Sequence, residues 1–370
     1  MNLPSVELLN KFAIDGELLG VESLKRGHIN DTFVSMWRGR QGVSRYVHQR
    51  VNKNVFPDPE LVMRNIVVVT DHLATKLGRG ISDPDTEDCA LTLVLAKNGE
   101  PWVIDPSGEY WRTYPFIDRT RCVDVCSSPS IAFEAGAAFG RFLNQVSDIP
   151  SEMLREPIYR FQDSTYRFEQ LEEAIALDPI SRVDEVQEEV NFAKSFLEFV
   201  QEIKQGESRG DIVRRITHGD PKINNVLLSE LTGRGVCIVD LDTCMPGTIV
   251  YDFGDLCRTS SIRAAEDEKD LSLVKVDLDL FAGVAEGFLP NVASTLSDFE
   301  REVLYLAPRL LTLTIGVRFL TDYINGDKYF RIHHPTHNLD RARTQFQGVR
   351  SMCQQGKEMQ EVVRSTLQRL

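Results

Sequence analysis

The 370-residue sequence lacks the features that mark membrane, secreted and disordered proteins. No apolar run approaches the ~18 residues needed to span a bilayer. The N-terminal segment has no basic stretch followed by an apolar core, so it does not resemble a secretory signal. Seven cysteines are spread over the chain without a CxxC pair, which favours reduced thiols. We therefore expect a cytoplasmic protein with no membrane partner.

Positive charge is also scarce. The chain has 42 Lys and Arg residues against 55 Asp and Glu residues, which gives a formal net charge of -13. Because such a chain repels phosphate backbones overall, we expect no nucleic-acid partner, although one locally cationic or metal-loaded site could still bind ATP. At ~150 residues per domain, the length allows roughly two or three domains or one bilobal unit.

The predicted elements change in character near residue 117. Before it, short β-rich runs surround one helix at 59–74; these runs lie at 33–36, 46–51, 90–96, 102–104 and 110–117. After it, apolar residues recur at helical spacing over 131–146, 186–203, 297–325 and 340–370, the last interrupted near Gly356. Ser297 and Glu300 form a capping-box pattern. We predict an α+β fold with a small β-rich lobe over 1–117 and a larger, mainly α-helical lobe over 118–370.

A predicted β-hairpin at residues 225–242 interrupts the helical lobe and carries polar residues at its ends. Its second strand runs through an apolar stretch into Asp240 and Asp242. Because side chains alternate along a strand, these two acids should share a face, with Cα atoms roughly 6–7 Å apart. The hairpin should also bring Asn225 towards Asp240. Amide and carboxylate oxygens are hard ligands suited to Mg²⁺, so we predict a Mg²⁺ site there.

His218, Asp220 and Asn225 follow the spacing His-x-Asp-x-x-x-x-Asn, and Asp240 follows an apolar strand. This combination resembles the catalytic loop and metal-binding Asp of protein-kinase-like phosphotransferases. The HRD, DFG and APE motifs of protein kinases are missing, and the His-Gly-Asp and Val-Asp-Leu-Asp sequences instead resemble the aminoglycoside phosphotransferase and choline kinase superfamily. Taken singly, an HGD tripeptide is a common loop sequence, and a strand-terminal Asp is often a helix cap.

Further segments resemble the N-acetylhexosamine 1-kinase family, over about residues 20 to 350. They follow the family's order at 27–33, 46–52, 111–117, 240–247, 252–255 and 318–323. The resemblance implies an ATP- and Mg²⁺-dependent, bilobal kinase that phosphorylates the anomeric hydroxyl of N-acetylglucosamine or N-acetylgalactosamine. The alternatives are the same chemistry on an aminoglycoside, choline, homoserine or another sugar, and a non-catalytic nucleotide-binding protein. We expect a monomer or weak homodimer.

The same resemblance implies roles for individual residues. Asp220 would be the base that accepts or orients the proton of the sugar hydroxyl. Asn225 and Asp240 would hold Mg²⁺, which bridges phosphate oxygens. Three roles stay open for Asp242: a second metal contact, a sugar contact and a bracing residue. His218 would brace the catalytic loop by hydrogen bonds.

Other roles rest on the resemblance alone. Asp252 would brace the catalytic loop. Arg50 would pair with ATP phosphates where related kinases place a lysine, with Glu60 as its partner; an exposed strand arginine is the alternative. The segment Tyr114, Pro115, Phe116 and Ile117 would be the hinge between the lobes and would present its backbone to adenine. The alternative is a plain edge strand.

Acceptor contacts are expected from two segments. The first segment holds His28, Asn30, Asp31 and Thr32. Without the resemblance, this segment would be an ordinary β-turn. The second holds Arg318 and Tyr329, which without the resemblance would be a helix-surface cation and a packing residue. A further group, His333, His334 and His337, suggests zinc, but Pro335 disfavours an HxxxH helix face. We therefore expect a solvated or lid loop there, with a structural metal as the alternative.

Overall fold

The computed structural model of the chain describes residues 3–24, 29–78, 83–85 and 87–370. The chain divides into two compact units that alternate along the sequence. Unit 1 consists of Met1–Arg121, Gln145–Tyr159 and Leu227–Pro246. Unit 2 consists of Cys122–Asn144, Arg160–Val226 and Gly247–Leu370. The lobe boundary predicted at residues 117 and 118 stays a prediction.

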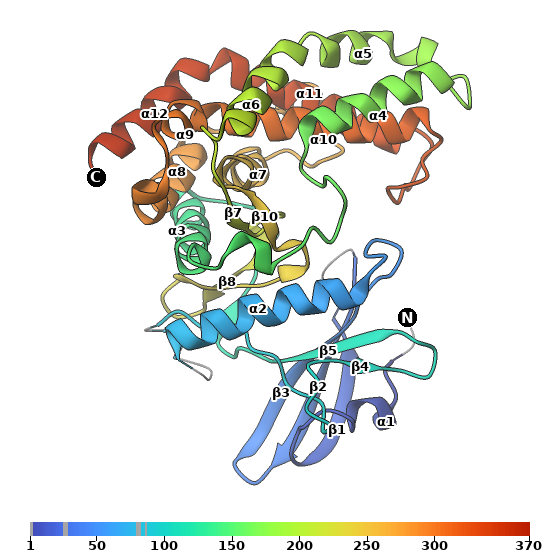
Figure 1. Ribbon diagram of the computed structural model, residues 1–370, viewed down its shortest axis with the longest axis vertical. Helices are drawn as coiled ribbons and strands as arrows, with labels where there is room; N and C mark the ends of the chain where they lie inside the picture. The colour runs from blue at the N-terminus through green and yellow to red at the C-terminus, as the bar shows by residue number, and fades with distance from the viewer. Residues whose placement is uncertain (1–2, 25–28, 79–82, 86) are drawn as a thin grey trace. The chain divides into compact units, whose positions relative to one another are not determined.

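An antiparallel sheet forms the centre of unit 1, with strand order β1-β2-β3-β5-β4 (Figure 1). Its strands are β1 (Glu17–Ser23), β2 (Asp31–Gly39), β3 (Gly42–Arg50), β4 (Val103–Ile104) and β5 (Tyr110–Pro115). The β2–β3 hairpin closes on the pair Gly39 and Gly42. Phe33, Trp37 and Trp111 belong to a buried core that also takes in residues of the short helix α1 (Val6–Leu9). Apolar packing therefore fixes the sheet register on one face.

Helix α2 (Pro59–Leu77) holds a second part of unit 1 in place. It begins after Asp58, whose side chain accepts a hydrogen bond from the Leu61 N–H. The buried Asn65 side chain donates to the carbonyls of Arg155, at 2.7 Å, and Cys244, at 3.0 Å. Helix α2 thereby fixes the segment that follows the strand β9.

Three short strands form a further sheet, with the order β6-β8-β9. Their bounds are β6 (Thr120–Arg121), β8 (Val226–Ser229) and β9 (Gly235–Ile238). Strands β8 and β9 are the two arms of the hairpin predicted from the sequence. The second arm is shorter than predicted, since β9 ends at Ile238 and a 3-10 turn follows at Leu241–Thr243.

Helices make up most of unit 2 (Figure 1). They are α3 (Pro129–Val146), α4 (Ser164–Leu177), α5 (Gln187–Lys194), α6 (Leu197–Arg209), α7 (Ile249–Ser261), α8 (Leu278–Val292), α9 (Asp298–Val303), α10 (Ala307–Ile324), α11 (His337–Gln354) and α12 (Gly356–Gln368). Helix α10 packs on α4, α7 and α11. Helix α7 approaches α10 so closely that a Cβ on Gly254 would lie 2.5 Å from the Ala307 carbonyl oxygen. A two-stranded sheet of β7 (Arg214–Thr217) and β10 (Met245–Thr248) precedes α7.

The segment Asp298–Ile324 is long and apolar enough to cross a membrane by length and composition alone. This corrects the expectation that no apolar run approaches that length. The greater part of its most apolar window, 72%, is buried inside the protein. Burial of α10 against its neighbouring helices accounts for the composition, because a helix that is apolar on all sides is suited to a protein core.

Several predicted elements differ from the structure. The run 90–96 is not a strand; among its residues, Val94 donates a backbone hydrogen bond to Thr113 and Ala96 forms an isolated bridge with Phe12. The predicted helix 186–203 is broken at Ser195 and Phe196 into α5 and α6. The capping box at Ser297 is confirmed, but α9 is short, and a 3-10 turn separates it from α10.

Candidate active site

The loop after β7 carries the predicted base in unit 2. Gly219 has φ +83°, a left-handed conformation that favours glycine, which explains the glycine of the His-Gly-Asp sequence. Asp252, on α7, accepts hydrogen bonds from the backbone N–H groups of His218, at 2.7 Å, and Gly219, at 3.0 Å. The bracing role of Asp252 stays a prediction, and these two contacts support it.

His218 is fully buried in the same unit. Its ring packs edge-on against Phe139 and Phe142, with centroid distances of 5.2 and 5.8 Å. Its Nδ1 accepts the N–H of Asp220 at 3.3 Å. The imidazole thus accepts a hydrogen bond from the backbone of the loop, and its bracing role stays a prediction that this contact supports.

Lys222 holds both oxygens of the Asp220 carboxylate. Its Nζ lies 2.8 Å from Oδ1 and 2.9 Å from Oδ2. The Asp220 side chain is 20% exposed. Burial acts to raise the pKa of Asp220, but the charge and hydrogen bond of Lys222 outweigh it, so the pKa is lowered. Sequence reasoning missed Lys222, although a cation two residues after the predicted base was a signal for it.

Asn225 ends the 3-10 turn Ile223–Asn225 that follows this loop. Its Nδ2 donates to the Asp220 carbonyl oxygen at 3.0 Å. This contact orients the side-chain amide, leaving Oδ1 as the atom able to ligate a cation. The predicted base and the predicted metal ligand are thus joined through one backbone group.

Helix α7 carries a second buried carboxylate, Asp255, one turn after Asp252. Burial raises the pKa of Asp252 to about 7, despite the two N–H groups that favour its charged form. Burial also raises the pKa of Asp255, whose carboxylate lies 2.7 Å from the Nε of Arg258. Burial thus favours the neutral form of both acids.

In unit 1, Asp240 does not lie on a strand. It follows the end of β9 and has φ 64° and ψ 56°, a left-handed conformation that is unusual for an aspartate. Asp242 lies in the next 3-10 turn. The prediction that Asp240 and Asp242 share one strand face is therefore wrong, because the chain turns at Asp240. Backbone strain of this kind is typical of ligand-binding positions.

Asp242 is a buried member of a polar network. Its carboxylate forms an ion pair with the fully buried Arg112 of β5 and accepts a hydrogen bond from Asn30. Arg112 also donates from Nε and Nη2 to Gln49, at 2.9 and 2.8 Å. Asn30 in turn accepts the N–H of Asn52 at 3.0 Å. These contacts favour the bracing role among the three that were open for Asp242.

The segment around Asn30 was predicted to contact the acceptor. His28 lies outside the described residues. Asp31 forms an ion pair with Arg50 across the β2–β3 pair. Thr32 is buried and accepts a hydrogen bond from Gln49 at 3.3 Å. The acceptor-binding roles of Asn30, Asp31 and Thr32 stay predictions.

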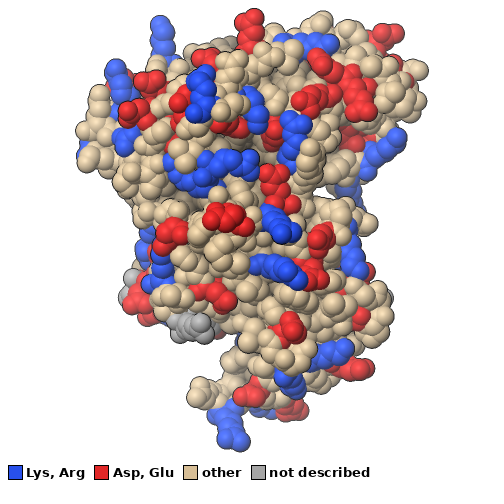
Figure 2. Space-filling view, viewed as in Figure 1, with Lys and Arg blue, Asp and Glu red and all other residues tan. Residues whose placement is uncertain are grey.

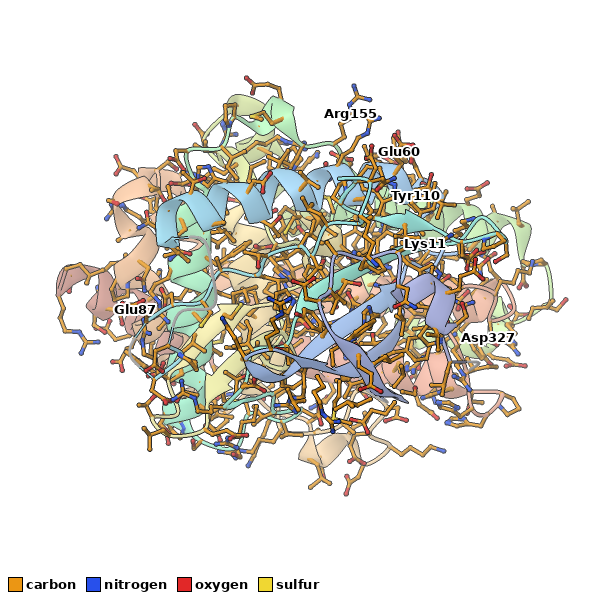
Figure 3. All side chains as sticks on the ribbon, turned by 90° about the horizontal axis from the view of Figure 1, so that it is seen from below. Lys11, Glu60, Glu87, Tyr110, Arg155 and Asp327 are labelled. Atoms are coloured by element: carbon orange, nitrogen blue, oxygen red, sulfur yellow. The ribbon has the colours of Figure 1, made fainter. Side chains whose placement is uncertain are left out.

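Glu60 is not the partner of Arg50. At the start of α2, where Figure 3 labels it, Glu60 pairs instead with Arg64, one helical turn later, at 2.5 Å. The partner of Arg50 is Asp31, which sequence reasoning could have found from the β2–β3 register. The Arg50 side chain remains 43% exposed, so its role towards nucleotide phosphates stays a prediction.

The predicted hinge lies at the end of β5. The N–H of Phe116 donates to the Arg45 carbonyl at 3.0 Å, and the Arg45 guanidinium lies 3.8 Å above the Phe116 ring centroid. Tyr114 and Ile117 are buried. The Phe116 N–H is therefore engaged, Pro115 has no N–H, and Tyr114 lies opposite Val47 in the β3–β5 ladder, so Ile117 is the residue of this segment that lies beyond the ladder.

Arg318 and Tyr329 are close to each other in unit 2. Arg318 lies on α10, with Nη2 3.5 Å from the Tyr329 hydroxyl. The loop that carries Tyr329 is held by Asp322, which accepts the N–H groups of Lys328, Tyr329 and Phe330 at 2.8 to 2.9 Å. Sequence reasoning missed Asp322, although a single acid near the end of a largely apolar helix was a signal for a capped loop.

The histidine segment is only partly solvated. His333 is exposed, but His337 begins α11 and is buried, with Nε2 3.0 Å from Asp267. The predicted solvated loop is therefore wrong for His337. Its ring stacks on that of His334, with the centroids 4.7 Å apart.

Charged side chains are mixed over the face of the protein in Figure 2, and no extended area of that face is basic only. The structure gathers His218, Asp220, Asn225 and Asp252 in unit 2. In unit 1 it brings Asn30 to Asp242 and Asp31 to Arg50. That Asn225 and Asp240 hold one cation stays a prediction.

Solved structures share this architecture at low sequence identity. An aminoglycoside phosphotransferase from Alicyclobacillus acidocaldarius matches with a TM-score of 0.57 and 12% identity, over 100% of this chain and 97% of that one. A choline kinase from Cryptosporidium parvum matches with a TM-score of 0.53 and 11% identity, over 94% and 93% of the two chains. A spectinomycin phosphotransferase, solved with ADP and spectinomycin, matches with a TM-score of 0.51 and 12% identity, over 95% and 94%.

The α+β arrangement, with a β-sheet N-terminal region and a helical C-terminal region, is thus the protein-kinase-like fold of these structures, and the predicted fold class is confirmed. Residues 22–279, which are more than half of the chain, match the family described as "phosphotransferase enzyme family". The chain belongs to this phosphotransferase family, as the His-Gly-Asp resemblance predicted.

Proposed function

We propose that the protein is an ATP-dependent N-acetylhexosamine 1-kinase, which transfers the γ-phosphate to the anomeric hydroxyl of N-acetylglucosamine or N-acetylgalactosamine. Membership of the phosphotransferase family supports the reaction class. The observation that carries the chemistry is the geometry of the catalytic loop, where Asp220 is held ionised by Lys222 and its backbone is held by neighbouring side chains. The choice of sugar rests on the ordered motifs at 27–33 and 318–323.

Asp220 would accept or orient the proton of the attacking hydroxyl. An anomeric hydroxyl is more acidic than an ordinary alcohol, so a carboxylate with a lowered pKa suffices as base. Phosphoryl transfer depends mainly on positioning and charge neutralisation. The hydrogen bonds of Asp252 and His218 serve the first need because they fix the loop conformation around Asp220.

The donor set fits Mg²⁺. Asn225 offers an amide oxygen, since its nitrogen donates to the Asp220 carbonyl, and Asp240 offers a carboxylate from a strained turn. These are the oxygen ligands that Mg²⁺ takes in phosphate-binding sites. When bound, Mg²⁺ would neutralise phosphate charge, and Asn225 and Asp240 would hold it.

ATP is the proposed co-substrate, since the spectinomycin phosphotransferase with the same fold was solved with ADP. Adenine would meet the backbone of Tyr114–Ile117, with the Ile117 N–H as the donor, because the Phe116 N–H is engaged. Arg50 would reach the phosphates from β3, exchanging Asp31 for a phosphate oxygen. We propose a cytoplasmic enzyme that acts as a monomer or weak homodimer.

The second candidate keeps the chemistry and changes the acceptor to an aminoglycoside, choline, homoserine or another sugar. The fold shared with aminoglycoside phosphotransferases and a choline kinase keeps this candidate open. The test supplies purified protein with MgATP and each acceptor, and follows the product by phosphorus NMR. The proposal expects a sugar 1-phosphate from N-acetylglucosamine or N-acetylgalactosamine. Turnover of another acceptor, with neither sugar used, would replace it with the second candidate.

A further inference from the structure

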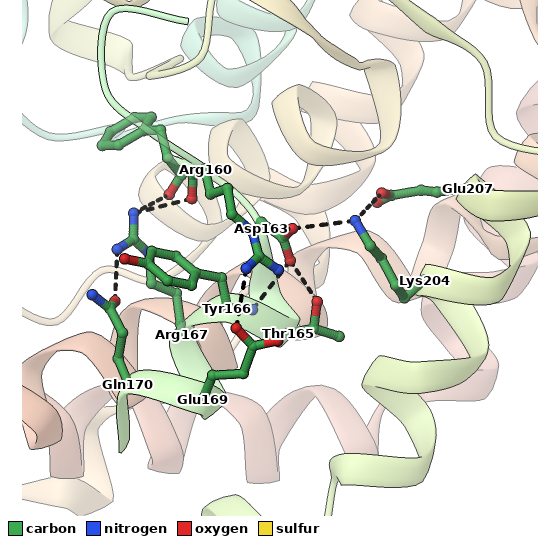
Figure 4. Close-up of polar contacts among 10 residues, drawn as sticks. Arg160, Asp163, Thr165, Tyr166, Arg167, Glu169, Gln170, Lys204 and Glu207 are labelled. Carbon is green, nitrogen blue, oxygen red and sulfur yellow. Dashed lines mark hydrogen bonds and ion pairs between the residues drawn. The ribbon is translucent and has the colours of Figure 1, made fainter. Parts of the chain in front are cut away.

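The first turn of α4 lies in a cluster of charged residues in unit 2 (Figure 4). Most cations of this cluster have carboxylate partners. Arg160 lies 3.0 Å from both Asp163 and Glu169, and Lys204 lies 3.2 Å from Asp163 and 3.0 Å from Glu207. Such pairing is the ordinary arrangement for half-buried charges.

Arg167 is the exception in this cluster. It is only 9% exposed, yet it has no ion pair among the described residues. Its guanidinium donates to three neutral oxygens: the side chain of Gln170 at 2.8 Å and the carbonyls of Arg160 and Phe161 at 3.2 and 2.7 Å. Its Nε has no hydrogen-bond partner within the described chain. A buried guanidinium thus keeps its charge and one unused donor.

A second guanidinium, that of Arg318 on α10, lies 5.3 Å from the ring centroid of Phe161, the residue whose carbonyl accepts a hydrogen bond from Arg167. Burial and then the charge of Arg318 lower the pKa of Arg167 to about 10. Arg318 likewise pairs with no carboxylate among the residues described; its guanidinium carbon lies 5.3 to 5.7 Å from the ring centroids of Phe161, Tyr329 and Phe330. Two neighbouring like charges without an anion are unfavourable, and a ligand anion would remove that cost.

The pair is adjacent to the catalytic loop within unit 2. Arg167 holds the carbonyl of Phe161, and the next residue, Gln162, donates to the Gly219 carbonyl at 2.6 Å. Asp220 follows Gly219. Arg167 is therefore separated from the loop that holds the proposed base by one short, hydrogen-bonded segment.

We propose that Arg167 and Arg318, together with the Tyr329 hydroxyl, form a binding site for a phosphoryl dianion. Guanidinium forks are well matched to phosphate oxygens. The dianion has two possible sources: the phosphoryl group of the product sugar 1-phosphate, and free inorganic phosphate. The first source rests on the proposed function, since a neutral hexosamine acquires negative charge only when it is phosphorylated. A site of this kind retains product after transfer, and so causes product inhibition.

The test titrates inorganic phosphate and N-acetylglucosamine 1-phosphate separately into the full-length protein by calorimetry. Saturating MgADP occupies the nucleotide site, so that neither ligand is measured there. Arg167→Gln removes the charge, and Arg350→Gln removes an exposed arginine of α11 as the matched control. We expect Arg167→Gln to weaken binding by about tenfold or more, as loss of a charge-assisted hydrogen bond does, and Arg350→Gln to leave it unchanged.

Each outcome decides the inference. If Arg167→Gln weakens binding of the sugar phosphate alone, the site binds the product. If Arg167→Gln weakens binding of both ligands, the site binds the phosphoryl group whether or not a sugar is attached. Equal binding by wild type and Arg167→Gln, or no binding of either ligand to wild type, overturns the proposal. If Arg167→Gln fails to fold by circular dichroism, Arg318→Gln titrated with inorganic phosphate, which carries no sugar, tests the same site. If no sugar is phosphorylated but the Arg167 effect persists, only the proposed acceptor is lost.

Discussion

Arg112 and Asp242 form an ion pair in which the two side chains are 0% and 4% exposed. The residues come from distant parts of the sequence, the strand β5 and the turn after β9. A buried pair of this kind contributes little net stability, but removal of one partner leaves the other charge without compensation. The pair therefore makes the position of the turn after Asp240 dependent on β5.

The first prediction concerns this pair. Asp242→Leu should destabilise the protein by about 3–5 kcal/mol, because Arg112 stays charged and buried. Adding Arg112→Met should restore most of the thermal stability. The enzymatic activity of the double variant then distinguishes the roles left open for Asp242. If Asp242 only braces the turn, the double variant should regain activity. If Asp242 contacts a ligand, activity should stay lost. Equal melting temperatures of wild type and Asp242→Leu would contradict the buried-pair account.

The second prediction concerns the proposed base. Asp220→Asn should bind MgATP with near wild-type affinity and lose phosphoryl transfer by about 10²-fold or more, since a positioned general base contributes 10²–10⁴-fold. Nucleotide titration and single-turnover kinetics measure the two steps separately. Unchanged turnover would remove Asp220 from its role.

The third prediction concerns Lys222. Lys222→Met removes the cation that keeps the pKa of Asp220 low, so the pKa should rise and the acid limb of the kcat profile should move to higher pH. Lys222→Arg is the control, because it keeps the charge and should keep the limb near its wild-type position. An acid limb at the same pH in Lys222→Met would show that Asp220 does not set that limb.

The fourth prediction concerns His48, which is buried in the sheet of unit 1 between Ser35 and Thr113. Burial lowers the pKa of His48 from 6.5 to about 4. Because the unfolded chain binds the proton more readily, His48 contributes stability that is present above pH 6.5 and lost as the pH falls towards 4. His48→Gln should flatten the fall in melting temperature over that window. Parallel curves for variant and wild type would refute this account.

The fifth prediction has the opposite sign and concerns Asp252, whose pKa burial raises to about 7. Here the folded protein binds the proton more readily than the unfolded chain does. The contribution is therefore fully present below about pH 4 and lost as the pH rises through 7. The stability advantage of wild type over Asp252→Asn should shrink across that window. Differential scanning calorimetry at pH 4 to 8 measures it, and an advantage that grows with pH would contradict the raised pKa.

Sequence patterns predicted the fold well where local and long-range preferences agreed. The helix from Pro59 and the capping box at Ser297 follow from local helix-capping chemistry. The pattern failed at 90–96, where an apolar β-rich run lies in irregular backbone with few ladder partners. Periodicity cannot show whether a neighbouring strand is present to pair with such a run.

The candidate site was predicted in part because its residue types have a fixed spacing in one loop. The contacts that position them were not predictable in the same way. Arg112 lies far from Asp242 in the sequence, and the conformation of Asp240 depends on how the turn after β9 packs on α2. The apolar run predicts an extended strand, because none of its residues indicates that the strand ends at Ile238.

The alternation of the two units along the chain has a consequence for dissection of the molecule. The polypeptide passes from one unit to the other after Arg121, Asn144, Tyr159, Val226 and Pro246. An N-terminal fragment that stops at Arg121 would lack β8, β9 and the Asp240 turn, while the remaining fragment would carry these strands without their sheet partner β6. No single cleavage point separates the molecule into two halves that are each complete, so neither half should be obtainable as a folded piece by truncation.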